Sequence, residues 1–593
     1  MFSFPKPSYE QFFHTYPIQT FAVSRDEKKL MYSTNMSGSY EVWRMNLSTG
    51  FSQPITSIGQ SNFGMTFSKD GQSLITSFDN DGDENAQIYA LPESGGELLP
   101  LLTGEGDRFM IGELTDDGNT LYYTTTKDNS TFLNICSYDL VTGNHYVMIE
   151  GKDAAHMFIT ASKSGKVAYM KLFANSHSPA FILANGKTIP LANDSEQSHN
   201  VAGGQFIGED TFYYLTNEGS ETSDLVKIDV TTEKIEKLTD EPHEDFTSMS
   251  YDKQKQLLYL VSSSGVEDTL YVYDIQASTL VQTELPVSIV EKLHIGESGA
   301  LYLLGRGATS PFNLYRRREN EKWAPLTEFS IPGIDEKELS EPDVITYRSF
   351  DDTEIEALYF KAHRENNNGK LVLWPHGGPQ ASERKSFRAM FQAMTYAGFS
   401  IIAPNFRGSS NYGKTFMKLV EGDWGYGPRL DNVHCLDYMI EEYGYKKGET
   451  LLVGGSYGGY MALLLHGRHP EYFKAVVDIF GVSNLFSFYH SVPEFWKPIM
   501  KTWIGDPETD KERFTRDSPI TYLSSMTKPM LVVQGANDPR VVQEESDQIV
   551  EALRAQGSEL DYLVLDDEGH GFSKKKNEIN VTKKINEFLL KFV

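Results

Sequence analysis

Ser456 lies in a short stretch whose residue types suit nucleophilic catalysis. Gly454-Gly455-Ser456-Tyr457-Gly458 fits the G-x-S-x-G pattern, in which a serine occupies a sharp turn between a strand and a helix. Glycines two positions before and after the serine allow such a turn and let neighbouring elements pack closely. A serine hydroxyl is a weak nucleophile, so it needs an adjacent base that a third group orients. We therefore expect Ser456 to be a nucleophile and look for its two partners.

Candidates for both partners follow in the order acid, then histidine, which is the order typical of this kind of turn. Asp538 lies in "QGANDPR" just after an apolar run, and His570 lies in "EGHGF" after the last such run. The other histidines near the site, His434, His466 and His469, fall in expected helices. Asp566 and Asp567 are alternative acids, but they adjoin the histidine loop, where a turn-capping role fits better.

Acyl transfer also needs donors for the negative oxygen of the tetrahedral intermediate. The segment "WPHGGPQ", from Trp374 to Gln380, follows another apolar run and has the pattern of a donor loop. We assign the two donors to the backbone N–H groups of Gly378 and Tyr457. The alternative is an ordinary turn at the end of a strand.

The elements that position these residues alternate between strand and helix from Gly369 onward. Short apolar runs such as "KLVLWP" and "KAVVDIFG" are separated by amphipathic segments, including 382–398, 429–443 and 541–557. Continuous apolar strands between such helices are typical of a mostly parallel sheet covered on both faces. The sequence therefore predicts an α/β-hydrolase domain with a doubly wound sheet over residues 326–593.

The preceding part of the chain repeats itself. Strand and turn patterns recur at intervals of 44 to 47 residues, anchored at Ser24, Ser68, Thr115, Ser162, Ile207, Tyr251 and Ile295. Short alternating strands with this period are typical of propeller blades, and two β-sandwiches are the alternative. We expect an N-terminal extension over residues 1–20 and a seven-bladed β-propeller over 21–325. The Asp-Gly pairs in the repeats are interpreted as hairpin turns.

The amino-acid composition limits the kinds of partner and cofactor that we expect the protein to bind. The 593 residues carry 82 acidic and 54 basic side chains, a net charge of −28, which argues against binding to nucleic acid or to an anionic membrane. Two distant cysteines, Cys136 and Cys435, indicate neither a disulfide framework nor a metal site. The N-terminal residues lack the apolar core of a signal peptide, and no long apolar run occurs. We expect a cytoplasmic protein without cofactor or metal; the sequence leaves room for a homo-oligomer.

The two-domain pattern and its motifs resemble the prolyl oligopeptidase family of serine peptidases. "HGGP", "APNFRGSSNYGKTF", "DWG", "GGSYGGYM", "NDPRV" and "EGHGF" are similar to the acylaminoacyl-peptidase branch. The resemblance implies hydrolysis of short peptides through an acyl-enzyme, with release of N-acylated amino acids or cleavage of oligopeptides. It also implies that Arg540, in "NDPRV", binds a substrate carbonyl.

The substrate class has alternatives. Dipeptidyl peptidases of the family carry a Glu-Glu pair in the propeller that binds a free amino terminus, and no such pair occurs before residue 330. A carboxylesterase would use the same three residues, and a non-enzymatic scaffold would not need them. Phe486, Phe488 and Trp496, which follow a strand after the nucleophile helix, are candidates for an apolar specificity pocket, or else pack in the core.

Overall fold

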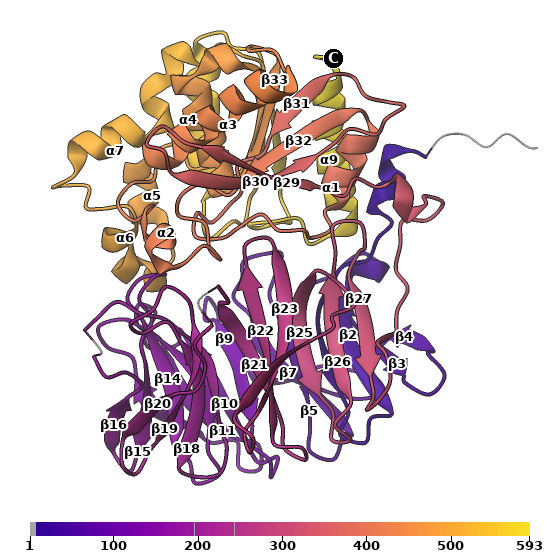
Figure 1. Ribbon diagram of the computed structural model, residues 1–593, viewed down its shortest axis with the longest axis vertical. Coiled ribbons are helices and arrows are strands. Elements are labelled where there is room, and N and C mark those ends of the chain that lie inside the picture. Colours follow the sequence, from indigo (N-terminus) through magenta and orange to yellow (C-terminus); the bar gives the residue numbers. More distant parts are fainter. Residues whose placement is uncertain (1–6, 195, 242) are drawn as a thin grey trace, which may run out of the picture.

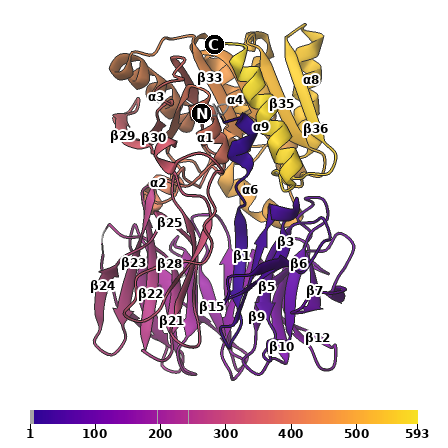
Figure 2. The same cartoon turned by 90° about the vertical axis from the view of Figure 1, so that its right-hand side faces the viewer.

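Two domains stack on one another in the computed structural model, which describes residues 7–194, 196–241 and 243–593 (Figures 1 and 2). The lower domain contains the strands from Ile18 to Pro325, and the upper domain contains those from Asp343 onward. The first six residues of the expected N-terminal extension lie outside the described ranges. The described part includes a 3₁₀ turn, η1 (Tyr9–Phe13), whose Phe12 and Phe13 pack against Phe387 and Ala393 of the upper domain.

The lower domain is a seven-bladed propeller, as the repeat predicts. Each blade is one antiparallel sheet of four consecutive strands. An Asp-Gly turn joins the first two strands of blade 2: Ser68 Oγ donates to Asp70 Oδ1 (2.7 Å), and Gly71 takes a positive φ of 68°. The strands are β1 (Ile18–Val23), β2 (Lys29–Thr34), β3 (Glu41–Asn46), β4 (Ser52–Pro54), β5 (Asn62–Phe67), β6 (Ser73–Phe78), β7 (Gln87–Pro92), β8 (Leu99–Leu102), β9 (Phe109–Leu114), β10 (Thr120–Thr125), β11 (Asn134–Asp139), β12 (His145–Glu150), β13 (Ala155–Ala161), β14 (Val167–Leu172), β15 (Ala180–Ala184), β16 (Lys187–Pro190), β17 (Val201–Phe206), β18 (Thr211–Thr216), β19 (Asp224–Asp229), β20 (Lys234–Lys237), β21 (Phe246–Asp252), β22 (Leu257–Ser264), β23 (Glu267–Asp274), β24 (Thr279–Thr283), β25 (Ile289–Ile295), β26 (Leu301–Arg306), β27 (Asn313–Arg317) and β28 (Ala324–Pro325).

The upper domain has the α/β-hydrolase fold that the sequence predicts. Its eight-stranded sheet has the order β29-β30-β32-β31-β33-β34-β35-β36 and is parallel from β32 to β36. The strands are β29 (Asp343–Arg348), β30 (Glu354–Phe360), β31 (Lys370–Leu373), β32 (Phe399–Pro404), β33 (Thr450–Gly455), β34 (Phe473–Ile479), β35 (Met530–Gly535) and β36 (Leu560–Leu565). The α-helices are α1 (Ala389–Tyr396), α2 (Lys414–Lys418), α3 (Gly427–Tyr443), α4 (Tyr457–Arg468), α5 (Leu485–Ser491), α6 (Lys497–Trp503), α7 (Lys511–Asp517), α8 (Gln543–Ala555) and α9 (Lys575–Leu590).

Helices cover both faces of this sheet. Apolar side chains of α3, α4 and α8 share one core with it, and those of α1 and α9 share a second core on the other face. Because parallel strands end together, the loops after β31, β33, β35 and β36 meet at one edge of the sheet. That edge faces the propeller (Figure 1).

One predicted helix is shorter than expected. The sequence predicts helix over 382–398, but α1 begins only at Ala389. The residues before it are held by tertiary contacts that a helix would break: Glu383 N–H donates to Asn405 Oδ1 (2.7 Å), and Lys385 N–H donates to the propeller's Val266 O (3.0 Å). Contacts outside the segment therefore override its helical pattern.

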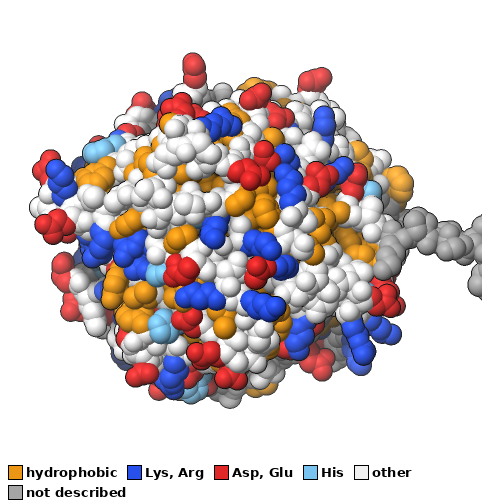
Figure 3. Space-filling model, turned by 90° about the horizontal axis from the view of Figure 1, so that it is seen from above, with side chains coloured by type: hydrophobic (Ala, Val, Ile, Leu, Met, Phe, Trp, Pro, Cys, Tyr) orange, Lys and Arg blue, Asp and Glu red, His pale blue; other side chains and the backbone are white. Residues whose placement is uncertain are grey.

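Acidic and basic side chains are interspersed on the face of the upper domain that points away from the propeller (Figure 3). Within the described residues, no helix combines the length and the apolar character needed to cross a membrane.

Asp478 is a carboxyl group buried in the upper domain, at the end of β34. Burial raises its pKa from 3.8 to about 7, because only the Gly481 N–H (2.9 Å) compensates the lost hydration. The folded state therefore binds this proton more tightly than the unfolded state does. The free energy of unfolding should fall as pH rises from about 4 to 7, by up to about 4 kcal/mol from this group. Denaturant titrations across this pH range should show that the free energy of unfolding falls more steeply with pH in the wild type than in Asp478→Asn. The same pH dependence in both proteins would contradict this prediction.

Candidate active site

Ser456 occupies the turn between β33 and α4 with φ of 59° and ψ of −124°, a conformation that non-glycine residues rarely adopt. The neighbouring glycines make the turn feasible. A Cβ on Gly454 would lie 2.1 Å from Gly458 O, and one on Gly458 would lie 2.1 Å from Pro375 O. The Ser456 N–H donates to Ile479 O (2.9 Å), which ties the turn to β34. The hydroxyl is thus held at the start of α4, where the helix dipole favours an anion.

The structure brings Asp538 and His570 to this hydroxyl. His570 Nε2 lies 2.9 Å from Ser456 Oγ, and His570 Nδ1 lies 2.6 Å from Asp538 Oδ2. The other oxygen, Asp538 Oδ1, accepts from the backbone N–H groups of Arg540 and Val541 (2.9 Å each). Both carboxylate oxygens are satisfied, so the carboxylate fixes the imidazole's orientation and can stabilise a positive charge on it.

The alternative residues lie elsewhere. His466 is buried in the core, where burial lowers its pKa to about 3 and its Nε2 accepts from Lys528 N–H (3.0 Å). Asp567 pairs with Lys574 (2.9 Å). Within the described ranges, no group of three or more His, Cys, Asp or Glu side chains is placed to hold a metal ion.

Glu568, which sequence reasoning missed, holds the histidine loop. Its carboxylate is fully buried and accepts from the Ser573 N–H (2.9 Å), the Ser573 hydroxyl (2.7 Å) and the Lys574 N–H (3.0 Å). The sequence shows a glutamate two residues before His570, but its burial and its donors, which a buried carboxylate needs, appear only in the folded structure.

The HGGP loop lies directly against the nucleophile. A Cβ on Gly377 would lie 3.5 Å from Ser456 Cβ. His376 anchors the loop by stacking on Phe406 (4.2 Å between ring centroids) and by contacting Gly377 O through Nδ1 (2.7 Å). Burial lowers the His376 pKa to about 4, so the ring is neutral near pH 7. Tyr457 is the first residue of α4, so its N–H has no acceptor within the helix.

Arg540 lies at the domain interface beside the triad. Its Nε is 2.7 Å from Oε1 of Glu84, which comes from the propeller loop after β6. Glu84 Oε2 also pairs with Arg108 Nη2 (3.0 Å). The two guanidinium groups share one carboxylate, so the Arg540–Glu84–Arg108 trio carries a net positive charge.

The three candidate pocket aromatics occupy different surroundings. Phe488 is buried against Trp424 (5.7 Å between centroids), Phe486 packs on Phe514 (5.2 Å), and Trp496 lies under the Arg540 guanidinium (5.9 Å). The structure thus brings only Trp496 to Arg540.

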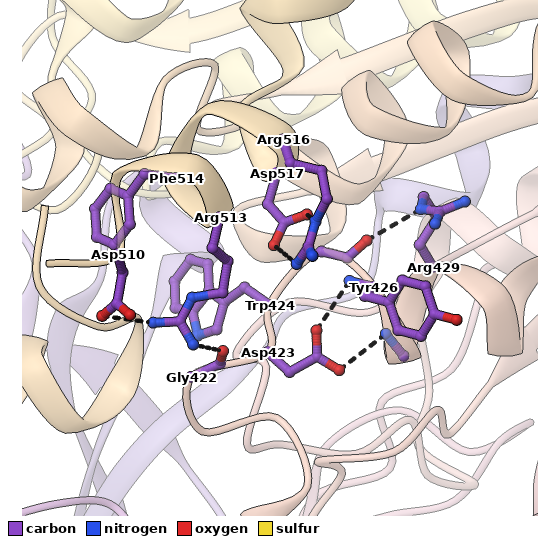
Figure 4. Close-up of polar contacts among 12 residues, drawn as sticks. Gly422, Asp423, Trp424, Tyr426, Arg429, Asp510, Arg513, Phe514, Arg516 and Asp517 are labelled. Atoms are coloured by element: carbon purple, nitrogen blue, oxygen red, sulfur yellow. Dashed lines mark hydrogen bonds and ion pairs between the residues drawn. The ribbon is translucent and has the colours of Figure 1, made fainter.

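A series of packed aromatic rings nevertheless connects Tyr457 with Trp496, which lies under Arg540. Trp424 packs on Tyr457 (5.0 Å) and on Trp503 (4.8 Å), which contacts Trp496 (5.8 Å). Polar contacts fix the Trp424 segment (Figure 4): Arg513 donates to Gly422 O, and Asp423 accepts from the N–H of Tyr426 (3.1 Å) and of Gly427 (3.0 Å).

The propeller also touches the catalytic loops directly. Asp81, in the loop between β6 and β7, pairs with Lys574 (2.7 Å), and its carbonyl accepts from Asn537 Nδ2 (3.1 Å). These contacts join one propeller loop to the loops that carry Asp538 and His570. From sequence, nothing links Asp81 or Glu84 to those residues, because the contacts form only when the domains pack.

The fold and the site together define a two-domain serine hydrolase whose triad faces a propeller. Two family models match the chain: the prolyl oligopeptidase family over residues 385–593, and the N-terminal β-propeller domain of prolyl oligopeptidase over residues 63–316. The chain belongs to the prolyl oligopeptidase family, and it is a serine peptidase of that family.

Individual relatives agree with this assignment. Dipeptidyl aminopeptidase BIII of Pseudoxanthomonas mexicana is 27% identical over 85% of this chain and 76% of that enzyme. The acylamino-acid-releasing enzyme of Arabidopsis thaliana is 28% identical over 234 residues, which are 38% of this chain and 31% of that enzyme. A puromycin-hydrolysing peptidase of Mycobacterium tuberculosis has the same fold, with a TM-score of 0.86 at 18% identity over 99% of this chain and 96% of that one.

Proposed function

We propose that this peptidase acts on short peptides with a blocked amino terminus and releases N-acylated amino acids. Ser456 attacks the scissile carbonyl while His570 takes the hydroxyl proton and Asp538 stabilises the resulting imidazolium. The N–H groups of Gly378 and Tyr457 stabilise the oxyanion. His570 then protonates the leaving amine, and water repeats the cycle on the acyl-enzyme.

The proposed substrate class rests on the Arg540–Glu84–Arg108 trio. Its net positive charge attracts a carbonyl or carboxylate and repels a substrate ammonium group. Arg540 donates to the acyl carbonyl, which requires no free amino terminus. The partly exposed ring of Trp496 lines the acyl side of the site, and the buried rings of Tyr457, Trp424 and Trp503 support it from the core, together with Phe486 and Phe488.

Domain boundaries and location complete the proposal. We divide the chain into an extension (1–20), a propeller (21–325) and a catalytic domain (326–593). Cys136 and Cys435 are both buried and unpaired, which suits a reducing cytoplasm.

Replacing Arg540 tests the substrate class. An arginine–carbonyl hydrogen bond contributes roughly 1.5–3 kcal/mol. Arg540→Ala should therefore lower kcat/KM for acetylated peptides by about 10- to 150-fold. Hydrolysis of p-nitrophenyl esters, which lack that carbonyl, should change far less. An equal fall for both substrates would mean that Arg540 supports the triad loop instead.

A dipeptidyl peptidase is the second candidate, because Dipeptidyl aminopeptidase BIII matches most of the chain. In that case Glu84 would bind the free amino group, and Glu84→Gln would selectively abolish cleavage of free-amine peptides. Under our proposal, the wild type prefers acetylated peptides to free-amine ones, and Glu84→Gln keeps that preference. A rate panel over free, acetylated and internal peptides, on both proteins, decides between the two.

A further inference from the structure

Phe480 combines an unusual backbone with a position beside the catalytic imidazole. It follows β34 directly and has a positive φ of 42°, which is a steric outlier for an aromatic residue. Its ring centroid lies 4.6 Å from that of His570 and 5.9 Å from that of Phe572. Strained residues that persist in a fold are held by their surroundings and cluster at functional sites.

Three backbone contacts hold Phe480 in this conformation. Its N–H donates to Val533 O (2.8 Å) on β35. The residue before it, Ile479, accepts from the Ser456 N–H (2.9 Å), and the residue after it, Gly481, donates to Asp478 Oδ1 (2.9 Å). The segment is therefore fixed to the nucleophile's own backbone, so the ring is placed relative to Ser456 as well as to His570.

The position of His570 decides which part of a substrate these rings meet. The imidazole protonates the leaving amine, so that amine must come within hydrogen-bonding distance of Nε2. The first residue of the leaving peptide is attached there. Phe480 and Phe572 are only partly buried, and the Phe480 ring packs on that of His570. Arg540 instead contacts Asp538 through the carboxylate oxygen that His570 does not use, and its guanidinium lies over Trp496.

We propose that Phe480 and Phe572 form an apolar subsite for the side chain on the carboxyl side of the scissile bond. This rests on the proposed function, since it uses Ser456 and His570 as nucleophile and base. Two partly exposed rings beside a leaving group favour aromatic and large aliphatic side chains, through burial of apolar surface and ring–ring contact. The strain at Phe480 is the structural cost of presenting a ring at this point.

The test compares acetyl-alanyl substrates that differ only in the residue after the scissile bond: Phe, Leu or Gly. In the wild type, kcat/KM should be about 10-fold higher for Phe than for Gly. Phe480→Gly should reduce this ratio to about 1. Glycine adopts φ of 42° without strain, so the variant keeps the backbone and loses only the ring. Phe480→Tyr should retain the preference.

Phe592→Ala is the matched control, because Phe592 is also a partly buried ring on the same core but packs at the end of α9 on Phe588. It should leave the ratio unchanged. Two results would overturn the proposed subsite. The first is a Phe-to-Gly ratio of kcat/KM that Phe480→Gly leaves unchanged. The second is an equal loss of kcat/KM for all three peptides and for a p-nitrophenyl ester, which would mean that Phe480 only supports His570. An inactive wild type would instead contradict the proposed function.

Discussion

Replacing Ser456 with alanine should abolish hydrolysis of every substrate while leaving the fold intact. The hydroxyl 2.9 Å from His570 Nε2 is the only group removed, and the turn is shaped by Gly454 and Gly458, which stay. In triad enzymes such a loss lowers turnover on the order of 10⁶-fold. Steady-state rates on acetylated peptides and p-nitrophenyl esters measure the effect.

Two controls separate lost chemistry from lost structure. Thermal unfolding of Ser456→Ala should match that of the wild type, and a fluorophosphonate probe should label the wild type alone. Near-normal turnover by the purified variant would exclude Ser456 as nucleophile. Normal turnover in Asp567→Asn would in turn agree with Asp538 as the acid, since Asp567 pairs with Lys574.

The meeting of Ser456, Asp538 and His570 could be predicted from sequence because each residue lies at the end of a readable strand. Ser456, Asp538 and His570 follow apolar runs that became β33, β35 and β36, and parallel strands bring their ends together. The seven blades were predictable because their strand and turn pattern recurs at a regular period, and a turn such as Asp70-Gly71 depends on local residues alone. In these cases local sequence and tertiary structure favour the same conformation.

Other features depend on contacts that no local pattern encodes. In "DIFGV", the sequence favours Gly481 as the residue with positive φ, yet Phe480 adopts it. Gly481 is needed for space instead, because a Cβ there would lie 2.3 Å from Asp478 Oδ1. Likewise, Glu84 meets Arg540 only because the propeller docks on the catalytic domain.

The backbones of the two domains approach each other closely at a pair of glycines, Gly82 and Gly569. A Cβ on Gly82 would lie 2.3 Å from the backbone nitrogen of Gly569, the residue before His570. Backbone atoms cannot yield as a flexible side chain can, so a larger residue would push the propeller loop and the histidine loop apart. The neighbouring contact between Asp81 and Lys574 (2.7 Å) would be strained as well. The propeller therefore helps to set the position of His570.

Gly82→Ala should consequently lower turnover on the order of 10²-fold, because a displacement of about 1 Å at a catalytic group costs that much. Unlike Arg540→Ala, it should affect acetylated peptides and p-nitrophenyl esters equally, since it acts on the triad itself. Gly71→Ala is the matched control: this turn glycine of the same blade has a similar φ of 68° but meets nothing within 4 Å. Both variants carry a similar backbone strain, so both should lose stability, and Gly82→Ala should lose more because its Cβ also clashes with Gly569. If Gly82→Ala and Gly71→Ala retain the same activity, the contact with Gly569 does not position the histidine.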